Sequence, residues 1–287
     1  MKQKWIMASA IIIGLFILAQ LFSLGAQDDI KNGNVAVIPV QGTIVATGES
    51  GVFQDSVVSS DEVLELIDKA TRDPRIKAIV FEINSPGGSA VASDEVGQAI
   101  KAIDLPTVAH IREVGASGGY WIASTTDYIV ANRMSMTGSI GVIASFLDFS
   151  GFIERYNVSY ERFVSGEYKD LGTPFRKVTN EERDIFQEKL DMIHDYFIQE
   201  VYENRHLSKD DESYELITSG SFFLGVEAYN LGLVDELGGQ VQVQEHLAQV
   251  LGEEAVFVRF ETEKSLFDIL SGDVRISLIP QSPLLLQ

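Results

Sequence analysis

The chain has 287 residues and a formal net charge of -20 at pH 7. Its length is enough to bury a substantial core in one large domain or two small ones. The negative charge argues against nucleic acid as a partner, because phosphate binding requires a concentrated basic surface. Cysteine is absent, which excludes disulfides, thiol catalysis and cysteine-ligated zinc. We expect no metal centre, since the four histidines show no paired ligand spacing, and no cofactor.

The amino-terminal segment predicts a membrane anchor. Residues 6–26 contain one strongly polar side chain, Gln20, and as a helix they would be about 31 Å long, enough to cross the hydrocarbon core. Lysines before the segment and aspartates after it favour a cytoplasmic amino terminus and an extracytoplasmic body. A cleaved signal peptide is the alternative, but its apolar core is normally shorter and residues 24–26 match its cleavage site poorly.

We therefore expect a single-pass protein of the cell membrane with its main domain on the extracytoplasmic side. Its expected parts are an anchor, a linker, a globular domain and a tail, at residues 1–26, 27–34, 35–270 and 271–287.

Strands and helices alternate through the globular domain. Apolar runs predict strands over residues 35–40, 76–83, 107–115, 127–131, 142–147 and 158–164. Helical spacing predicts helices that begin near Ser60, Ala90 and Thr179, and residues 222–260 predict helix, strand, helix, strand. Residues 42–60 are rich in glycine, serine and threonine and predict a mobile loop, and the glycines and serine of residues 136–141 predict a further loop. The pattern indicates an α/β fold with a largely parallel sheet.

A serine among glycines, Ser117, follows the strand predicted at 107–115. Glycines on both sides allow a sharp turn, and a helix that starts there leaves free N–H groups beside the hydroxyl. Ser117 is therefore a candidate nucleophile. The alternative is a packing turn in which the serine only caps the helix.

A second glycine loop, 86–88, follows the preceding strand. Loops at the carboxyl ends of neighbouring parallel strands meet at one edge of the sheet. One N–H from Gly87 or Gly88 and one from Gly118 could then form an oxyanion hole for a carbonyl attacked by Ser117. The alternative is that Pro-Gly-Gly is only a helix entry.

A serine nucleophile also needs a base. The histidines favour structural or solvated roles by their positions in a strand or on amphipathic helices: His110, His194, His206 and His246. A neutral lysine can replace histidine, and Lys169 follows a predicted strand. Its alternative is a solvated loop lysine beside Glu167 and Asp170.

Five motifs occur together in an order that resembles the signal peptide peptidase SppA family, in its short, single-repeat, anchored form. They are N-S-P-G-G-S at 84–89, A-S-G-G-Y at 116–120, T-G-S-I-G-V at 137–142, S-G-E-Y-K at 165–169 and G-L-V-D-E-L-G at 232–238. The likeness covers roughly residues 35 to 260, and jointly spaced motifs are more specific than any one alone.

The resemblance implies a ClpP/crotonase-like fold of repeated strand-strand-helix units and a serine protease with a Ser/Lys dyad. Ser117 matches the nucleophile, Lys169 the general base, and Ser139 a serine that orients the lysine. It also implies a homo-oligomeric ring whose sites combine serine and lysine from neighbouring subunits. The implied substrates are signal peptides left in the membrane and other apolar peptides.

A lysine acts as a base only when it is neutral, so its pKa of about 10.4 must fall by about 3. Because the chain is acidic, burial must supply this change. The remaining alternatives are a crotonase-type acyl-CoA hydrolase or isomerase, a hydrolase with a conventional histidine triad, and an inactive membrane-anchored scaffold.

Overall fold

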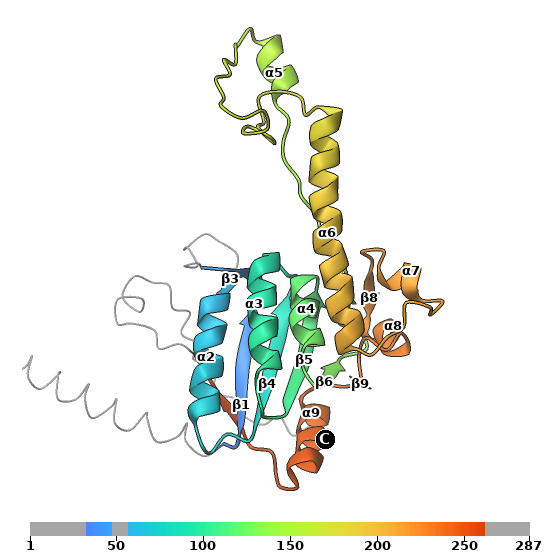
Figure 1. Ribbon diagram of the computed structural model, residues 1–287. Coiled ribbons are helices and arrows are strands. Elements are labelled where there is room, and N and C mark those ends of the chain that lie inside the picture. Colours follow the sequence, from blue (N-terminus) through green and yellow to red (C-terminus); the bar gives the residue numbers. More distant parts are fainter. Residues whose placement is uncertain (1–32, 48–56, 262–287) are drawn as a thin grey trace, which may run out of the picture.

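The computed structural model describes residues 33–47 and 57–261 (Figure 1). Its centre is a parallel sheet whose main strands run in the order β10 (Phe257–Arg259), β1 (Val35–Gln41), β4 (Ala78–Ser85), β5 (Thr107–Ala116), β6 (Tyr128–Ala131), β9 (Glu236–Leu237). At the carboxyl end of β5 the sheet continues through β7 (Met136–Gly138), which pairs antiparallel with β8 (Phe222–Leu224). Two short strands, β2 (Thr43–Val45) and β3 (Val57–Ser59), form a separate parallel pair.

Helices cover both faces of the sheet. The larger core cluster joins one face to α2 (Ser60–Arg72), α3 (Ala90–Lys101) and α4 (Gly118–Ser124). The smaller cluster joins the other face to α9 (Gln240–Leu251). The central strand β4 is almost wholly buried, as a strand covered on both faces should be.

The helix α6 (Asn180–Asn204) extends well beyond the sheet, and α5 (Ser150–Arg155) lies at its far end (Figure 1). We call residues 142–179 with the first half of α6 the arm. The second half of α6 joins the core, where Phe197 stacks on Trp121 of α4 with ring centroids 4.8 Å apart. The short helices α7 (Tyr214–Ile217) and α8 (Gly225–Asn230) lie beside it.

Most of the predicted elements are confirmed. Ser59 and Thr179 cap α2 and α6, and each accepts a hydrogen bond from the amide three residues ahead. The mixed α/β fold with a largely parallel sheet is also confirmed. The region 222–260 has the predicted helix, strand, helix, strand, with the additional strand β8 before them.

Two predicted strands are wrong. Residues 142–147 and 158–164 form no strand, because both runs lie on the arm, away from the sheet edges that could pair with them. Their apolar side chains are exposed instead; Ile143 is 87% and Phe163 91% exposed. Parts of the two predicted loops do form strands, namely β2, β3 and β7.

None of the helices within residues 33–47 and 57–261 is long and apolar enough to cross a membrane. The predicted anchor at 1–26, most of the linker and the tail at 271–287 lie outside the described residues. The domain boundaries therefore stay predictions.

Candidate active site

Ser117 occupies the turn between β5 and α4 with φ 52° and ψ -124°. A residue other than glycine held at positive φ costs on the order of 1–3 kcal/mol, and such strain gathers at functional sites. The amide of Ser117 donates to Gly138 O at 2.8 Å, which joins this turn to the end of β7. The hydroxyl makes no capping hydrogen bond to α4. The capping alternative is therefore wrong, and no described residue forms a hydrogen bond with this hydroxyl.

The loop after β4 lies directly against this turn. A Cβ atom added to Gly87 would lie 2.6 Å from Gly118 N and 2.8 Å from Ser117 Cβ. Gly87 has φ 99°, which suits glycine alone among common residues. Both the space and the backbone conformation thus require glycine here, and the two predicted loops meet as expected.

The Gly87 amide is already engaged, because it donates to Ser85 Oγ at 3.0 Å. Gly88 forms a parallel bridge with Ile44 of β2, and the two hydrogen bonds of the bridge involve the residues on either side of Gly88. Ile44 N donates to Gly87 O at 2.9 Å, and Ser89 N donates to Ile44 O at 2.8 Å. In a parallel bridge of this kind the N–H of Gly88 itself points away from β2.

Backbone amides remain available beside Ser117. Among the described residues, the N–H groups of Gly88 and Gly118 have no hydrogen-bond acceptor. The two groups are close, since a Cβ on Gly118 would lie 3.3 Å from Gly88 N. Paired free amides next to a serine hydroxyl are the arrangement that stabilises an oxyanion during acyl transfer.

Sequence reasoning missed the role of Ser85. Its side chain is fully buried at the end of β4 and accepts the amide two residues ahead, as in a serine turn. A serine placed directly before Pro-Gly was the signal that could have revealed it. By engaging Gly87, Ser85 leaves Gly88 as the free donor.

Ser139 also lies at this site. It follows Gly138, the acceptor for the Ser117 amide, and it too has a positive φ of 52°. Its amide donates to Ser221 O at 2.9 Å and its hydroxyl to Gly220 O at 3.4 Å. The carboxyl ends of β5 and β7 thus bring together the two serines named from the sequence.

Lys169 is not brought to Ser117 within one chain. It is an exposed residue of the arm, and its neighbour Tyr168 donates from its hydroxyl to Glu181 at 2.5 Å. Ser117 adjoins α4, whose Trp121 contacts α6 at Phe197. Glu181 and Phe197 are separated by about 24 Å of helix at 1.5 Å per residue. The serine and the lysine therefore lie at opposite ends of this span.

The histidines take other places. Successive strand residues face opposite sides of a sheet, so His110 shares the face of Val108, which packs against α9 rather than α4. Burial, assisted by the charge of Arg112, lowers the pKa of His110. His246 of α9 stacks on Tyr128 with centroids 3.7 Å apart.

His194 of α6 is the histidine joined to the serine site, through a 3.0 Å contact between its Nε2 and Ile140 O. His206 lies just beyond the carboxyl end of α6, with φ 53°. The ring of His194 is thus engaged with the backbone of the residue after Ser139.

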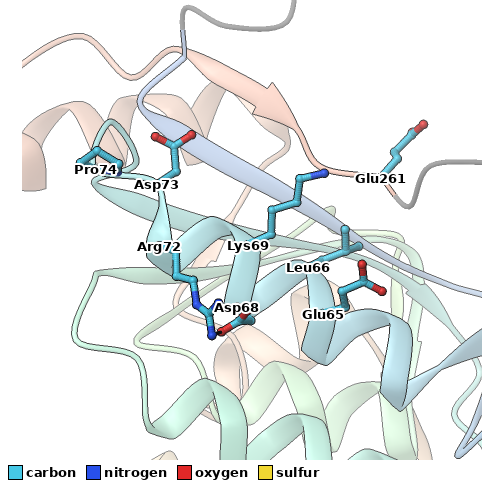
Figure 2. A pocket seen from close by; sticks show the side chains of 8 residues that line it. All are labelled: Glu65, Leu66, Asp68, Lys69, Arg72, Asp73, Pro74 and Glu261. Carbon is cyan, nitrogen blue, oxygen red and sulfur yellow. Dashed lines mark ion pairs between the residues drawn. The ribbon is translucent and has the colours of Figure 1, made fainter.

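A groove of about 800 Å³ lies between α2 and Glu261, which follows the edge strand β10 (Figure 2). Its lining is mostly charged, and Arg72 pairs with Asp68 across 2.9 Å. It contains none of the predicted site residues and lies apart from the Ser117 turn. We therefore place the candidate active site at the glycine loops.

Comparison with known proteins identifies the family. The model of Peptidase family S49 matches residues 99–253, and that of the NfeD1b N-terminal domain matches residues 34–149. A putative protease of Methanocaldococcus jannaschii is 32% identical over 225 residues, which are 76% of this chain and 71% of the relative. A putative signal peptide peptidase SppA of Enterococcus faecium is 33% identical over 74% of this chain and 62% of its own length.

Protease 4 of Haemophilus influenzae is 34% identical over 71% of this chain but only 32% of its own length, so the chain spans a third of that longer relative. Among solved structures, a mutant of the 1510-N membrane-bound stomatin-specific protease covers 80% of this chain at 15% identity and a TM-score of 0.48. The family match covers more than half of the chain, and the relatives named as proteases agree with it. The chain belongs to Peptidase family S49.

Proposed function

We propose that this protein is a membrane-anchored serine endopeptidase that uses Ser117 as its nucleophile and Lys169 as its general base. The observation that carries the proposal is the free hydroxyl of Ser117 beside the free amides of Gly88 and Gly118. Membership of a peptidase family supports hydrolysis of peptide bonds. The order of parallel strands supports the finer assignment to the ClpP/crotonase-like fold.

The reaction follows from these atoms. Ser117 Oγ attacks the carbonyl carbon of the scissile peptide while its proton passes to the neutral amine of Lys169. The developing oxyanion accepts hydrogen bonds from the Gly88 and Gly118 amides, each worth about 3–4 kcal/mol in such sites. The lysine then protonates the leaving amine, and water releases the acyl group from the serine. We propose that Ser139, next to the residue that accepts the Ser117 amide, orients the incoming lysine.

The lysine comes from a second copy of the chain. Lys169 is exposed on the arm and is separated from its own Ser117 by a span of about 24 Å of helix. Exposed apolar residues on the arm, such as Ile143 and Phe163, supply a surface for contact with another subunit. We propose a ring of subunits in which each arm reaches the serine of a neighbour, and burial at this contact makes the lysine neutral.

The proposed substrates are signal peptides that remain in the membrane and other apolar peptides. The relative named signal peptide peptidase SppA supports this class, as does the apolar segment at 6–26, which would hold the enzyme at a membrane. We place the catalytic domain on the extracytoplasmic side of the cell membrane, as the charges flanking that segment favour.

Two substitutions test the dyad. We expect Ser117→Ala and Lys169→Ala each to abolish hydrolysis of an apolar peptide, because one removes the nucleophile and the other the base. Lys177→Ala removes another exposed lysine of the arm and should leave the rate unchanged. Turnover close to that of the wild type in Lys169→Ala would refute the dyad.

Mixing the two inactive variants tests the shared site. If the lysine acts on the serine of a neighbour, mixed assemblies contain some sites with both residues, and activity should partly recover. Demonstrably mixed assemblies without activity would argue against sharing. Labelling of Ser117 by a serine-directed acylating probe separates this enzyme from an inactive scaffold, and coenzyme A binding would favour an acyl-CoA enzyme instead.

A further inference from the structure

The loop that carries Lys169 is fixed by an ionic network on both sides of the lysine. Asp170, the next residue, accepts hydrogen bonds from Arg162 at 2.7 and 2.6 Å and from Arg176 at 2.9 and 2.9 Å. Arg162 also donates to Glu167 O at 2.8 Å. Both oxygens of the Asp170 carboxylate are thus engaged by two planar guanidinium groups, an arrangement with strong geometric preference.

Arg176 connects this loop to the start of α6. It donates to Glu182 Oε2 at 2.8 Å in addition to its contacts with Asp170. Glu182 is 3% exposed and belongs to the capping box of α6, where it accepts from Thr179 N at 2.9 Å. Hydrogen bonds from Arg176 and Thr179 lower the pKa of Glu182 to about 2. One arginine therefore joins the residue after Lys169 to the first turn of a long helix.

Lys169 itself is left unengaged. Its neighbour Tyr168 donates a hydrogen bond to Glu181 in the first turn of α6. By contrast, no described residue forms an ion pair or side-chain hydrogen bond with Lys169. Residues 161–169 are all exposed, so apolar packing holds this loop mainly at its flank, where the rings of Tyr160 and Phe175 meet. The ionic network, together with the Tyr168 hydrogen bond to Glu181, fixes the loop itself.

We propose that Arg176 is a positioning residue for Lys169: it clamps Asp170 onto the start of α6 and so presents the lysine to the serine of a neighbouring subunit. This inference rests on the proposed Ser117 and Lys169 dyad. The same arrangement explains how Asp170 can stand directly beside Lys169 without preventing the lysine from acting as a base. A free carboxylate would pair with the ammonium form and favour protonation, but Asp170 is already held by two arginines, which keep the pKa of its carboxyl well below the usual range.

The pH profile distinguishes positioning from general support of the fold. In Arg176→Met the loop loses its ionic link to α6, and Asp170 keeps only Arg162 as a partner. The charge of Asp170 is then less fully compensated beside Lys169, which favours the protonated lysine. We expect kcat at neutral pH to fall about 100-fold, as small misplacements of catalytic groups do, with little change in KM. The acid limb of the kcat profile should also move to higher pH. A purely structural role would lower the rate at every pH without moving that limb.

Two further variants separate position from charge. Arg176→Lys keeps the positive charge but loses the planar guanidinium group. Its kcat should therefore stay low although its arm is folded. Arg183→Met removes a charge from an exposed residue on the same helix turn and should behave like the wild type. Full activity in Arg176→Lys would overturn the proposal.

Mixed assemblies show in which subunit the arginine acts. Arg176→Met placed in the Ser117→Ala chain, which supplies the lysine, should lower the activity recovered on mixing about 100-fold. The same substitution in the Lys169→Ala chain, which supplies the serine, should leave that activity unchanged. Equal effects in both chains would overturn the positioning role while the shared dyad stands. If the parent mixture is inactive, the shared site itself fails.

Discussion

At the scale of single residues, the site depends on which backbone amides are occupied. Gly87 and Gly88 are adjacent and look equivalent in sequence, yet only the Gly87 amide has an acceptor, Ser85 Oγ. The buried hydroxyl of Ser85 thereby selects Gly88 as the donor that faces the serine turn.

This selection predicts the effect of Ser85→Ala. The substitution leaves the Gly87 amide buried without an acceptor, and the peptide plane that carries it is no longer fixed. We expect kcat to fall about tenfold or more, since loss of a full oxyanion donor costs about 100-fold or more, with KM nearly unchanged. The rate of Ser117 acylation by a serine-directed probe should fall in parallel. Ser85→Thr keeps the hydroxyl and should restore both; unaltered acylation in Ser85→Ala would contradict this role.

Local pattern predicted that the serine and glycine loops meet, whereas Lys169 was named only through the family resemblance. Ser117, Gly88 and Gly118 lie on loops that follow neighbouring parallel strands, so strand order alone brings them together. Lys169 follows residues 142–147 and 158–164, neither of which pairs with the sheet. Its position therefore depends on the arm and, in our proposal, on contacts with another subunit. Local pattern carries no information about such a position.

At the scale of elements, the helix α4, which begins directly after Ser117, is held by α6. Trp121 and Phe197 stack at this contact, and Phe197 is 2% exposed. We expect Phe197→Ala to lower the free energy of unfolding by about 3–5 kcal/mol, through lost burial and the cavity left behind. Urea unfolding followed by circular dichroism measures the change. The neighbouring Tyr196 is exposed on the same helix, so Tyr196→Ala should change stability little; equal losses in both would show that the contact with α4 is unimportant.

The errors in predicted elements have a common cause. Residues 142–147 and 158–164 have the apolar character of strands, but a strand forms only where another strand can pair with it. The structure places both runs on the arm, where their apolar side chains are exposed. Conversely, residues 136–138 were predicted as loop and form β7, because β5 is long enough to pair with β6 in its first half and β7 in its second. In both cases the presence or absence of a neighbouring strand determined whether the segment formed a strand.

At the scale of the whole molecule, a buried apolar core and an ionically fixed arm respond differently to acid. The pKa of Glu182 falls from 4.5 to about 2 in the folded chain, mainly through Arg176. A lowered carboxyl pKa adds stability above the unfolded value, and this contribution disappears as the pH falls from about 4.5 toward 2. The stability of the sheet does not depend on the pair of Glu182 and Arg176 in this way.

We therefore expect the arm to open in acid before the sheet unfolds. Hydrogen exchange followed by mass spectrometry should show faster exchange in residues 162–182 at pH 3 than at pH 6, after correction for intrinsic rates. Strands β4 and β5 should stay protected. Arg176→Met should show fast exchange in the arm at both values, because its network has already lost the link between Asp170 and Glu182. An arm protected equally at both pH values in the wild type would contradict the ionic account.

The pairing of β1 with β10 has a consequence for biosynthesis. These strands belong to opposite ends of the described chain, and Val256 and Asn34, 222 positions apart, also share a hydrogen bond. One edge of β1 therefore stays open until the ribosome has released Phe257 and the residues after it. Open strand edges pair readily with other chains, so a product truncated before β10 carries an aggregation-prone edge that the finished protein covers.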